Sequence, residues 1–215
     1  MSESLNINGT LTDQSDLERW GAAKCDLGLE NWRALLSEEL AALSPVREIL
    51  VSEGSKIREF NNLTAFSESS LLGMIAKQFI SQKWSKRVSF DTIYHVIDQP
   101  GTIHRNQKFH FDTIPCVKLI LNLNVEEASA TEFIKGSHTF FWPRVSGILF
   151  KLSRGRIKLA GKGTEHLYGN EKIVQSDKLN FFTDDGVVFF TNTYHRAGTK
   201  VENGRQIIII TLRLH

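Results

Sequence analysis

The 215-residue chain contains few cysteines and no long apolar run. Cys25 and Cys116 are too few for a disulfide scaffold or a cysteine metal cluster, so a reducing, cytoplasmic location is expected. No segment approaches the roughly 18 apolar residues of a membrane span. The N-terminal sequence MSESLNINGT also lacks the basic and apolar regions of a signal peptide. A membrane partner is therefore not expected.

A strong excess of charge of either sign is also missing. Lys and Arg number 26 against 24 Asp and Glu, a balance that gives no reason to expect nucleic acid as a partner. Hydrophobic residues make up 41% and charged residues 23%, ordinary globular values that exclude long disorder and coiled-coil character. A chain of this length is expected to form a single domain, residues 1–215, and nothing in it specifies an oligomeric state.

The N-terminal part, residues 1–87, is expected to be mainly helical. Roughly the first sixteen residues are polar and are interpreted as a tail. After Asp26, taken as an N-cap, apolar residues recur at three- and four-residue steps and predict a helix that stops at the Ser-Pro pair 44–45. A second helix with one apolar face is predicted to start near 67–69. Both helices are expected to pack against the core.

The C-terminal part, residues 88–215, has the pattern of strands. Four segments rich in β-branched and aromatic residues predict strands at 88–97, 116–125, 186–195 and 205–214. In the second of them, Lys118 and Asn122 share the face opposite an apolar row. The Asn-Gly pair at 203–204 predicts a turn that joins the last two strands. An antiparallel sandwich or jelly roll buttressed by N-terminal helices fits this order best.

The sequence KFHFDTIP contains a candidate metal-binding pair. His110 and Asp112 are two residues apart, so on extended backbone both side chains project from the same face. His195 ends an apolar strand at the expected rim of the barrel and is the candidate third ligand. Two histidines and one carboxylate that leave open positions form the facial triad of non-haem Fe(II) oxygenases. Hydrolytic zinc uses the same ligand types, so the triad alone does not fix the metal.

Arg205 favours an oxygenase. A 2-oxoglutarate co-substrate presents a distal carboxylate, which the planar guanidinium group of arginine holds bidentately. A hairpin through the Asn-Gly turn would bring Arg205 close to His195. Arg213 lies about 26 Å farther along the strand at about 3.3 Å per residue, which is too far to serve the same site. Asn122 and Thr131 are candidates for further co-substrate contacts, with ordinary polar packing as the alternative.

These motifs resemble one family in their order along the chain. HFD (110–112), ASATEFIKGSH (128–138), DDGVVFFTNTYHRAG (184–198) and GR (204–205) resemble the phytanoyl-CoA dioxygenase-like branch of the Fe(II)/2-oxoglutarate-dependent oxygenases. The resemblance covers residues 88–215. It implies a mainly β fold whose core is a double-stranded β-helix, that is, a cupin-like jelly-roll barrel. It further implies iron ligation by His110, Asp112 and His195, and a 2-oxoglutarate anchor at Arg205.

The resemblance also implies a reaction. O₂ and 2-oxoglutarate would be consumed and succinate and CO₂ released, with ascorbate as a supporting reductant. Asp112 is present where halogenating relatives carry a small residue, so the expected outcome is hydroxylation of a small organic substrate by a dioxygenase. Two alternatives remain open: a cupin-like metal-dependent isomerase, epimerase or hydrolase, and a non-catalytic small-molecule binding barrel.

Residues 139–164 form a basic insert in the C-terminal part. The insert contains glycines and no acidic residue, and its cations are Arg144, Lys151, Arg154, Arg156, Lys158 and Lys162. One interpretation is a solvated loop. The other is a lid that recruits an anionic substrate, such as a coenzyme A thioester, a phosphate ester or a carboxylate.

Overall fold

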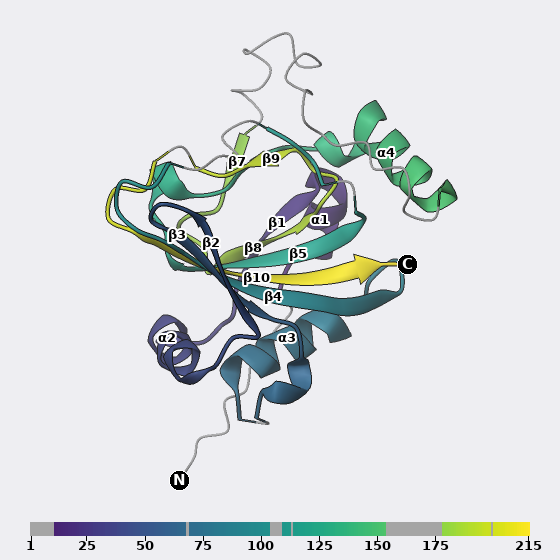
Figure 1. The fold of residues 1–215 in the computed structure, drawn as a ribbon. Helices are drawn as coiled ribbons and strands as arrows, with labels where there is room; N and C mark the ends of the chain where they lie inside the picture. Colours follow the sequence, from purple (N-terminus) through teal and green to yellow (C-terminus); the bar gives the residue numbers. More distant parts are fainter. Residues whose placement is uncertain (1–10, 68, 104–108, 113, 154–177, 199) are drawn as a thin grey trace.

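Two antiparallel β-sheets lie face to face, and two helices cover the outer face of the larger sheet (Figure 1). The computed structural model describes residues 11–67, 69–103, 109–112, 114–153, 178–198 and 200–215.

The larger sheet has seven strands in the order β1-β8-β5-β10-β4-β3-β2. Every neighbouring pair in this sheet is antiparallel. The smaller sheet has the order β7-β6-β9 and is also antiparallel. In chain order the strands are β1 (Ala22–Cys25), β2 (Arg47–Ser52), β3 (Ser55–Phe60), β4 (Val88–Asp98), β5 (Cys116–Asn124), β6 (Glu132–Ile134), β7 (Lys178–Asn180), β8 (Gly186–Phe190), β9 (His195–Arg196) and β10 (Arg205–Leu214).

Two of the helices, α1 and α3, begin at side-chain caps. The Asp13 carboxylate accepts hydrogen bonds from backbone N–H groups at the start of α1, and the Ser70 hydroxyl accepts one at the start of α3. Longer helices are α1 (Gln14–Trp20), α2 (Trp32–Ala42), α3 (Leu71–Ser81) and α4 (Phe141–Leu152), and the 3₁₀ turns are η1 (Leu63–Ala65), η2 (Glu127–Ser129) and η3 (Ser137–Thr139). Within the described residues, no helix is long and apolar enough to cross a membrane.

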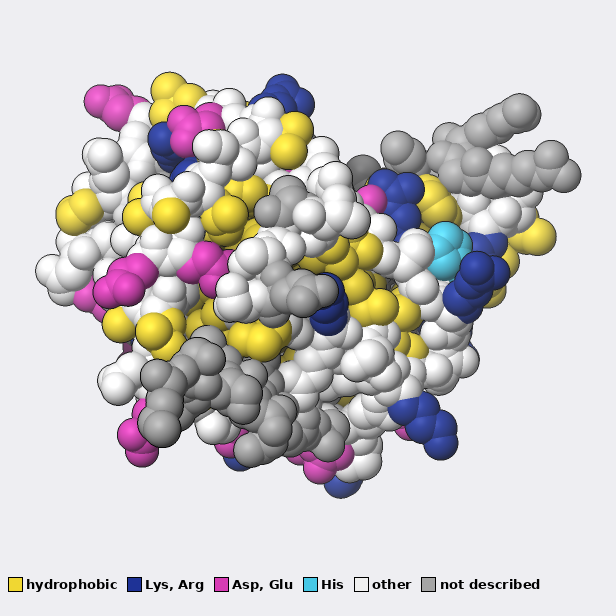
Figure 2. Space-filling model, turned by 90° about the horizontal axis from the view of Figure 1, so that it is seen from below, with side chains coloured by type: hydrophobic (Ala, Val, Ile, Leu, Met, Phe, Trp, Pro, Cys, Tyr) yellow, Lys and Arg dark blue, Asp and Glu magenta, His cyan; other side chains and the backbone are white. Residues whose placement is uncertain are grey.

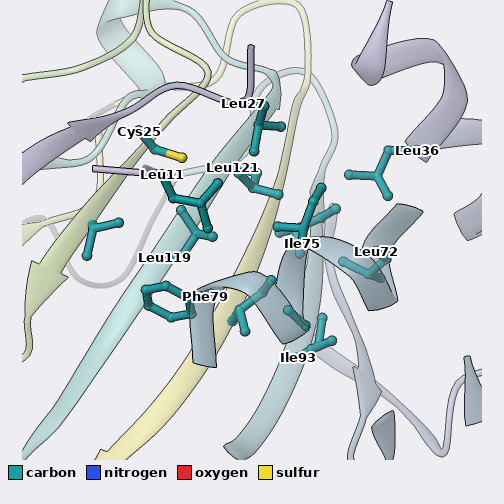
Figure 3. Packing of buried hydrophobic residues seen from close by; sticks show 14 of the residues in the cluster. Leu11, Cys25, Leu27, Leu36, Leu72, Ile75, Phe79, Ile93, Leu119 and Leu121 are labelled. Carbon is teal, nitrogen blue, oxygen red and sulfur yellow. The ribbon is translucent and has the colours of Figure 1, made fainter. Parts of the chain in front are cut away.

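The two faces of the larger sheet bury different clusters. On the outer face, α3 packs against β4 and β5 through Leu72, Ile75 and Phe79. Leu119 and Leu121 of β5 point toward these side chains (Figure 3). The inner face contributes to a second cluster between the sheets, formed by Ala22, Ile120, Phe133, Val187, Phe189 and Ile207. Side chains of a strand alternate between faces, so the predicted polar face of β5 with Lys118 points into the space between the sheets.

The face that carries α2 and α3 is shown in Figure 2. Acidic and basic side chains are spread over this face among apolar ones and form no large patch of one sign. This distribution agrees with the nearly balanced charge of the chain.

The N-terminal part differs from the prediction in three ways. Residues 11–16 are not a tail, because Leu11 is fully buried and Thr12 forms a bridge with Cys25. Asp26 is not a helix cap: its carboxylate accepts the Gly28 N–H in a turn after β1, and α2 starts later. Residues 1–87 also contain β1, β2 and β3 beside the predicted helices, so this part is less helical than expected.

The predicted strand 186–195 is broken. The Thr191 hydroxyl bonds to the backbone of β5 and the Thr193 N–H bonds to Phe190, so the chain turns out of the larger sheet. It then enters the smaller sheet as β9, whereas β10 lies between β5 and β4. The predicted hairpin between the last two strands is therefore wrong, although Gly204 does adopt a positive φ of 93° in the connecting turn.

Candidate active site

A backbone bridge holds the two candidate histidine ligands together. The His110 N–H donates to the His195 carbonyl at 2.9 Å, and the His195 N–H donates to the His110 carbonyl at 2.8 Å. The Asp112 N–H donates to the Thr191 carbonyl at 2.7 Å and extends this pairing. Directly paired residues of antiparallel segments project from the same face. The two imidazole rings accordingly lie with their centroids 4.5 Å apart.

The structure brings His110, Asp112 and His195 into one cluster. Their ligand atoms all lie within 4.8 Å of one another, close enough for a single ion to contact all three. The His195 Nδ1–H donates to the Thr193 carbonyl at 2.8 Å, so this proton is fixed and the Nε2 lone pair is left for a metal. The donor set is thus two imidazole nitrogens and one carboxylate oxygen, the ligand types of a facial triad.

The protonation states of the cluster also suit a cation. Burial lowers the pKa of His195 to about 4, so its ring is neutral at physiological pH. Burial alone would raise the pKa of the Asp112 carboxyl, but the Lys118 ammonium and the rings of His195 and His110 outweigh it and hold this pKa below its usual value. Asp112 is therefore ionised. Its Oδ2 accepts a hydrogen bond from Lys118 Nζ at 2.7 Å, which orients the carboxylate.

The three residues line a cavity of about 290 Å³ between the sheets. Arg205 and Thr131 line the same cavity, as does Lys118. Arg205 is only 4% exposed, and its Nη2 donates a hydrogen bond to the Thr131 hydroxyl oxygen at 3.4 Å. The structure thus brings five of the six predicted site residues into one cavity, and Asn122 is the exception. His195 and Arg205 are not brought together by the predicted hairpin. They are neighbours because β9 and β10 belong to different sheets that face each other across this cavity.

A buried carboxylate accompanies Arg205. Arg205 and Asp98 are directly opposite on β10 and β4, and Nη1 donates to Asp98 Oδ2 at 3.2 Å. The Ser55 hydroxyl on β3 donates to the other Asp98 oxygen at 2.7 Å. Burial lowers the pKa of the Arg205 guanidinium and Asp98 opposes this effect, so the group stays charged. Asp98 fixes one side of the guanidinium group in place and leaves the Thr131 side toward the cavity.

Asn122 and Arg213 lie outside this group. The Asn122 amide donates to the carbonyls of Phe181 and Asp184, and its side chain is not among those that line the cavity. Asn122 therefore holds the loop before β8 and does not line the cavity that contains Arg205. Arg213 pairs with Asp91 at 2.6 Å on the surface, at the far end of β10, as its spacing from Arg205 predicts.

Sequence reasoning missed Asp98 and the role of Lys118 beside Asp112. Asp98 ends a predicted strand next to the turn sequence Gln-Pro-Gly, but only the register between β4 and β10 shows that it meets Arg205. The alternation of apolar and polar residues along 116–125 puts Lys118 on the polar face of its strand, and this face is the one that lines the cavity. Of the basic insert, 139–153 lies in the described part, mostly as α4, and 154–164 lies outside it.

Comparison with known proteins gives structural relatives only. No protein-family model matches the chain, and no curated protein sequence matches it. Among solved structures it is similar to the non-haem alpha-ketoglutarate-dependent epimerase SnoN from nogalamycin biosynthesis (11% identity, 93% of this chain and 80% of that one, TM-score 0.59). It is also similar to HygX from Streptomyces hygroscopicus with nickel and 2-oxoglutarate bound (11%, 94% and 85%, 0.58).

A third similar structure is an oxidoreductase of the 2OG-Fe(II) oxygenase family from Burkholderia pseudomallei (10% identity, 97% of this chain and 92% of that one, TM-score 0.58). At such identities the likeness establishes the fold. The mainly β jelly-roll prediction, a double-stranded β-helix with added helices, is confirmed.

Proposed function

We propose that the chain is a non-haem Fe(II)/2-oxoglutarate-dependent oxygenase that acts on a small organic molecule. The observation that carries this proposal is the convergence of His110, Asp112 and His195 with the buried Arg205 in one cavity. The phytanoyl-CoA dioxygenase-like motif order supports the same class. A cytoplasmic location is part of the proposal, and the two buried, unpaired cysteines support it.

His110, Asp112 and His195 would hold the iron. Lys118 holds Asp112 by its Oδ2 atom, and the Thr193 carbonyl holds His195 by its Nδ1–H, so two of the ligands are oriented before a metal arrives. Bound Fe(II) and 2-oxoglutarate supply the oxidative chemistry, in which O₂ is consumed and succinate and CO₂ are released. The rings of Phe133 and Phe189 beside His195 keep water from that side of the centre.

Arg205 and Thr131 would hold the far carboxylate of 2-oxoglutarate. A guanidinium N–H and a hydroxyl group lie beside each other at the cavity wall and can both donate to one carboxylate. Asp98 keeps the guanidinium group from rotating away, at the expense of part of its positive charge. A co-substrate seated here would lie between β10 and the histidine pair, inside the sandwich.

Hydroxylation is the proposed outcome for the substrate, and Asp112 supports it because a carboxylate ligand leaves no site for a halide. Epimerisation is the second candidate, because SnoN is an epimerase with this fold. SnoN and HygX have also been solved with nogalamycin RO and hygromycin B respectively, so small-molecule substrates are compatible with the fold. The two outcomes differ in the product, since hydroxylation adds an oxygen atom and epimerisation leaves the composition unchanged.

The test is succinate release from 2-oxoglutarate by the purified protein with Fe(II), O₂ and ascorbate, alongside calorimetric titration of Fe(II) under anaerobic conditions. His195→Ala and Asp112→Asn are expected to lose metal binding and succinate release together. His215→Ala is the matched control, because the hydrogen bonds of His215 to described residues join its ring to the Ser89 hydroxyl and its N–H to the Arg87 carbonyl, away from the cavity. Metal binding by the wild type that is unchanged in His195→Ala would overturn the assigned centre.

A hydrolase would need the metal but not the co-substrate. Arg205→Lys separates these cases, because it keeps the charge and loses the planar pair of donors. We expect Arg205→Lys to bind Fe(II) normally and to need much more 2-oxoglutarate, with Arg213→Lys unchanged. Equal 2-oxoglutarate dependence in both variants would contradict an oxygenase that uses this anchor.

A further inference from the structure

A second cavity, of about 470 Å³, lies between α4 and the ends of β5, β8 and β10. Figure 1 shows α4 outside the sandwich, on the side where the chain ends. Apolar side chains form much of the lining, with Trp84, Ile148 and Leu214 from three separate parts of the chain. A cavity of this size accepts a small organic molecule.

One face of α4 points into this cavity. Arg144, Ile148 and Lys151 follow one another at four- and three-residue steps, which places them on one side of the helix, and all three line the cavity. Ile148 is 55% exposed although it lies on a cavity wall. The helix thus presents an uncovered apolar side chain between two cations.

The charge in the cavity is mainly positive. Lys86 joins Arg144 and Lys151 on the lining, and no carboxylate in the described part of the chain forms an ion pair with any of these three. The acidic groups on the lining are Glu18 and Asp112, and Asp112 is already paired with Lys118. An anion that enters would therefore meet cations that form no ion pair with a carboxylate of the described residues.

Asp112 connects this cavity to the candidate metal centre. It lines both the cavity under α4 and the cavity that contains His110, His195 and Arg205. A molecule in the cavity under α4 would reach the centre on the Asp112 side, and Arg205 does not line that cavity. The two cavities therefore allow co-substrate and substrate to bind at the same time.

We propose that the cavity under α4 binds the substrate that is oxidised, and that this substrate is an organic anion with an apolar body. Arg144 and Lys151 bind the anionic group, a carboxylate or a phosphate ester, and Trp84, Ile148 and Leu214 contact the apolar body. The apolar body is then the part that extends toward Asp112. This assignment rests on the proposed function, because it takes Asp112 as an iron ligand.

The test measures binding to the metal-free and the Fe(II)-loaded protein by calorimetry, with octanoate and octyl phosphate as probes. Octanol has the same body without the charge, and inorganic phosphate has the charge without the body. We expect octanoate or octyl phosphate to bind at least about tenfold more tightly than either control, because charge and apolar contact act together. The tighter of the two identifies the anionic group. Octanol that binds as tightly as both anions, or inorganic phosphate that matches octyl phosphate, would overturn the proposal.

Variants locate the binding in the cavity. Arg144→Glu and Lys151→Glu change exposed helix positions, so the fold is kept, and each is expected to weaken probe binding at least about tenfold through charge repulsion. Ile148→Ser is expected to weaken it several-fold. Lys77→Glu on α3 is the matched control and is expected to stay within about twofold. Probe binding that is unchanged in both α4 charge variants would place the anion elsewhere and refute the assignment.

Failure of the cavity assignment and failure of the oxygenase function give different results. Succinate release with the expected variant effects, together with no binding of either anionic probe, would leave the oxygenase intact and overturn this cavity as the anion site. Probe binding that depends on Arg144 and Lys151 in a protein that binds no Fe(II) would support the anion site and contradict the oxygenase. Stimulation of succinate release by the tighter probe supports both.

Discussion

The pair formed by Arg205 and Asp98 leads to a prediction that separates folding from binding. Both side chains are almost fully buried, at 5% and 0% exposure, and they form an ion pair with each other. Arg205→Met therefore removes the guanidinium group from beside a buried carboxylate. Breaking a buried pair from one side costs about 3–5 kcal/mol, and the low exposure here calls for no discount for solvent screening. We expect this loss in the free energy of unfolding measured in urea.

The double variant Arg205→Met/Asp98→Asn removes both charges. The asparagine oxygen still accepts the Ser55 hydroxyl, which donates to Asp98 at 2.7 Å in the native chain. We expect the double variant to regain most of the lost stability, since replacing a whole buried pair by neutral groups of similar volume is often nearly neutral. Arg213→Met, which changes an arginine 54% exposed, is the control and should leave stability almost unchanged.

Binding of 2-oxoglutarate should not recover with stability. A charge-assisted hydrogen bond contributes about 1.5–3 kcal/mol, so losing the guanidinium group is expected to raise the Kd of the Fe(II)-loaded protein by roughly a factor of 100. The assay is anaerobic calorimetric titration with 2-oxoglutarate on the wild type and the double variant. A stable double variant that binds 2-oxoglutarate like the wild type would show that Arg205 only supports the fold. An Arg205→Met chain as stable as the wild type would refute the buried-pair argument.

Three further predictions concern other residues of the sandwich. Thr131→Val keeps the shape and loses the hydroxyl beside Arg205, so the KM for 2-oxoglutarate should rise several-fold with kcat unchanged; an unchanged KM would remove Thr131 from the site. Burial lowers the pKa of His95 from 6.5 to about 4, although its hydrogen bond to Gln206 acts in the opposite direction. As the pH falls, His95 therefore takes up a proton in the unfolded chain before it does so in the folded chain. Stability should drop by about 3 kcal/mol between these pH values, and His95→Gln should lose less in urea titrations across that window; an identical acid dependence would contradict this assignment. In Gly186→Ala the new Cβ would lie 2.1 Å from the Ile120 carbonyl oxygen, so β8 must shift away from β5. The free energy of unfolding, followed by a thermal melt, should fall by about 1–3 kcal/mol, and an unchanged melt would show that the two strands adjust without cost.

The spacing and alternation of residues within single segments predicted which side chains share a face. The alternation along β5 placed Lys118 on the inner face, and the structure has it there beside Asp112. The spacing of His110 and Asp112 placed their side chains together without knowledge of the tertiary fold. Period and spacing therefore carried the metal-centre prediction.

Long-range pairing explains what could not be predicted. The break after β8 depends on the Thr191 hydroxyl finding backbone partners in β5, 75 residues away in the chain. Likewise, Asp98 meets Arg205 only because β10 inserts between β5 and β4. The sequence GVVFFTNTYH predicts one continuous strand because its apolar pattern does not show that a threonine hydroxyl will take the place of a backbone hydrogen bond between strands.

The division of the site between two layers has a consequence for selectivity. His195 belongs to the three-stranded layer and Arg205 to the seven-stranded one, so the proposed oxo-diacid would be gripped at its two ends by different layers. Phe133 of the three-stranded layer packs against Phe189 of the seven-stranded one, with the ring centroids 4.9 Å apart. Trimming or enlarging this pair would act as a spacer, tuning the chain length of the diacid accepted while every polar contact keeps its identity.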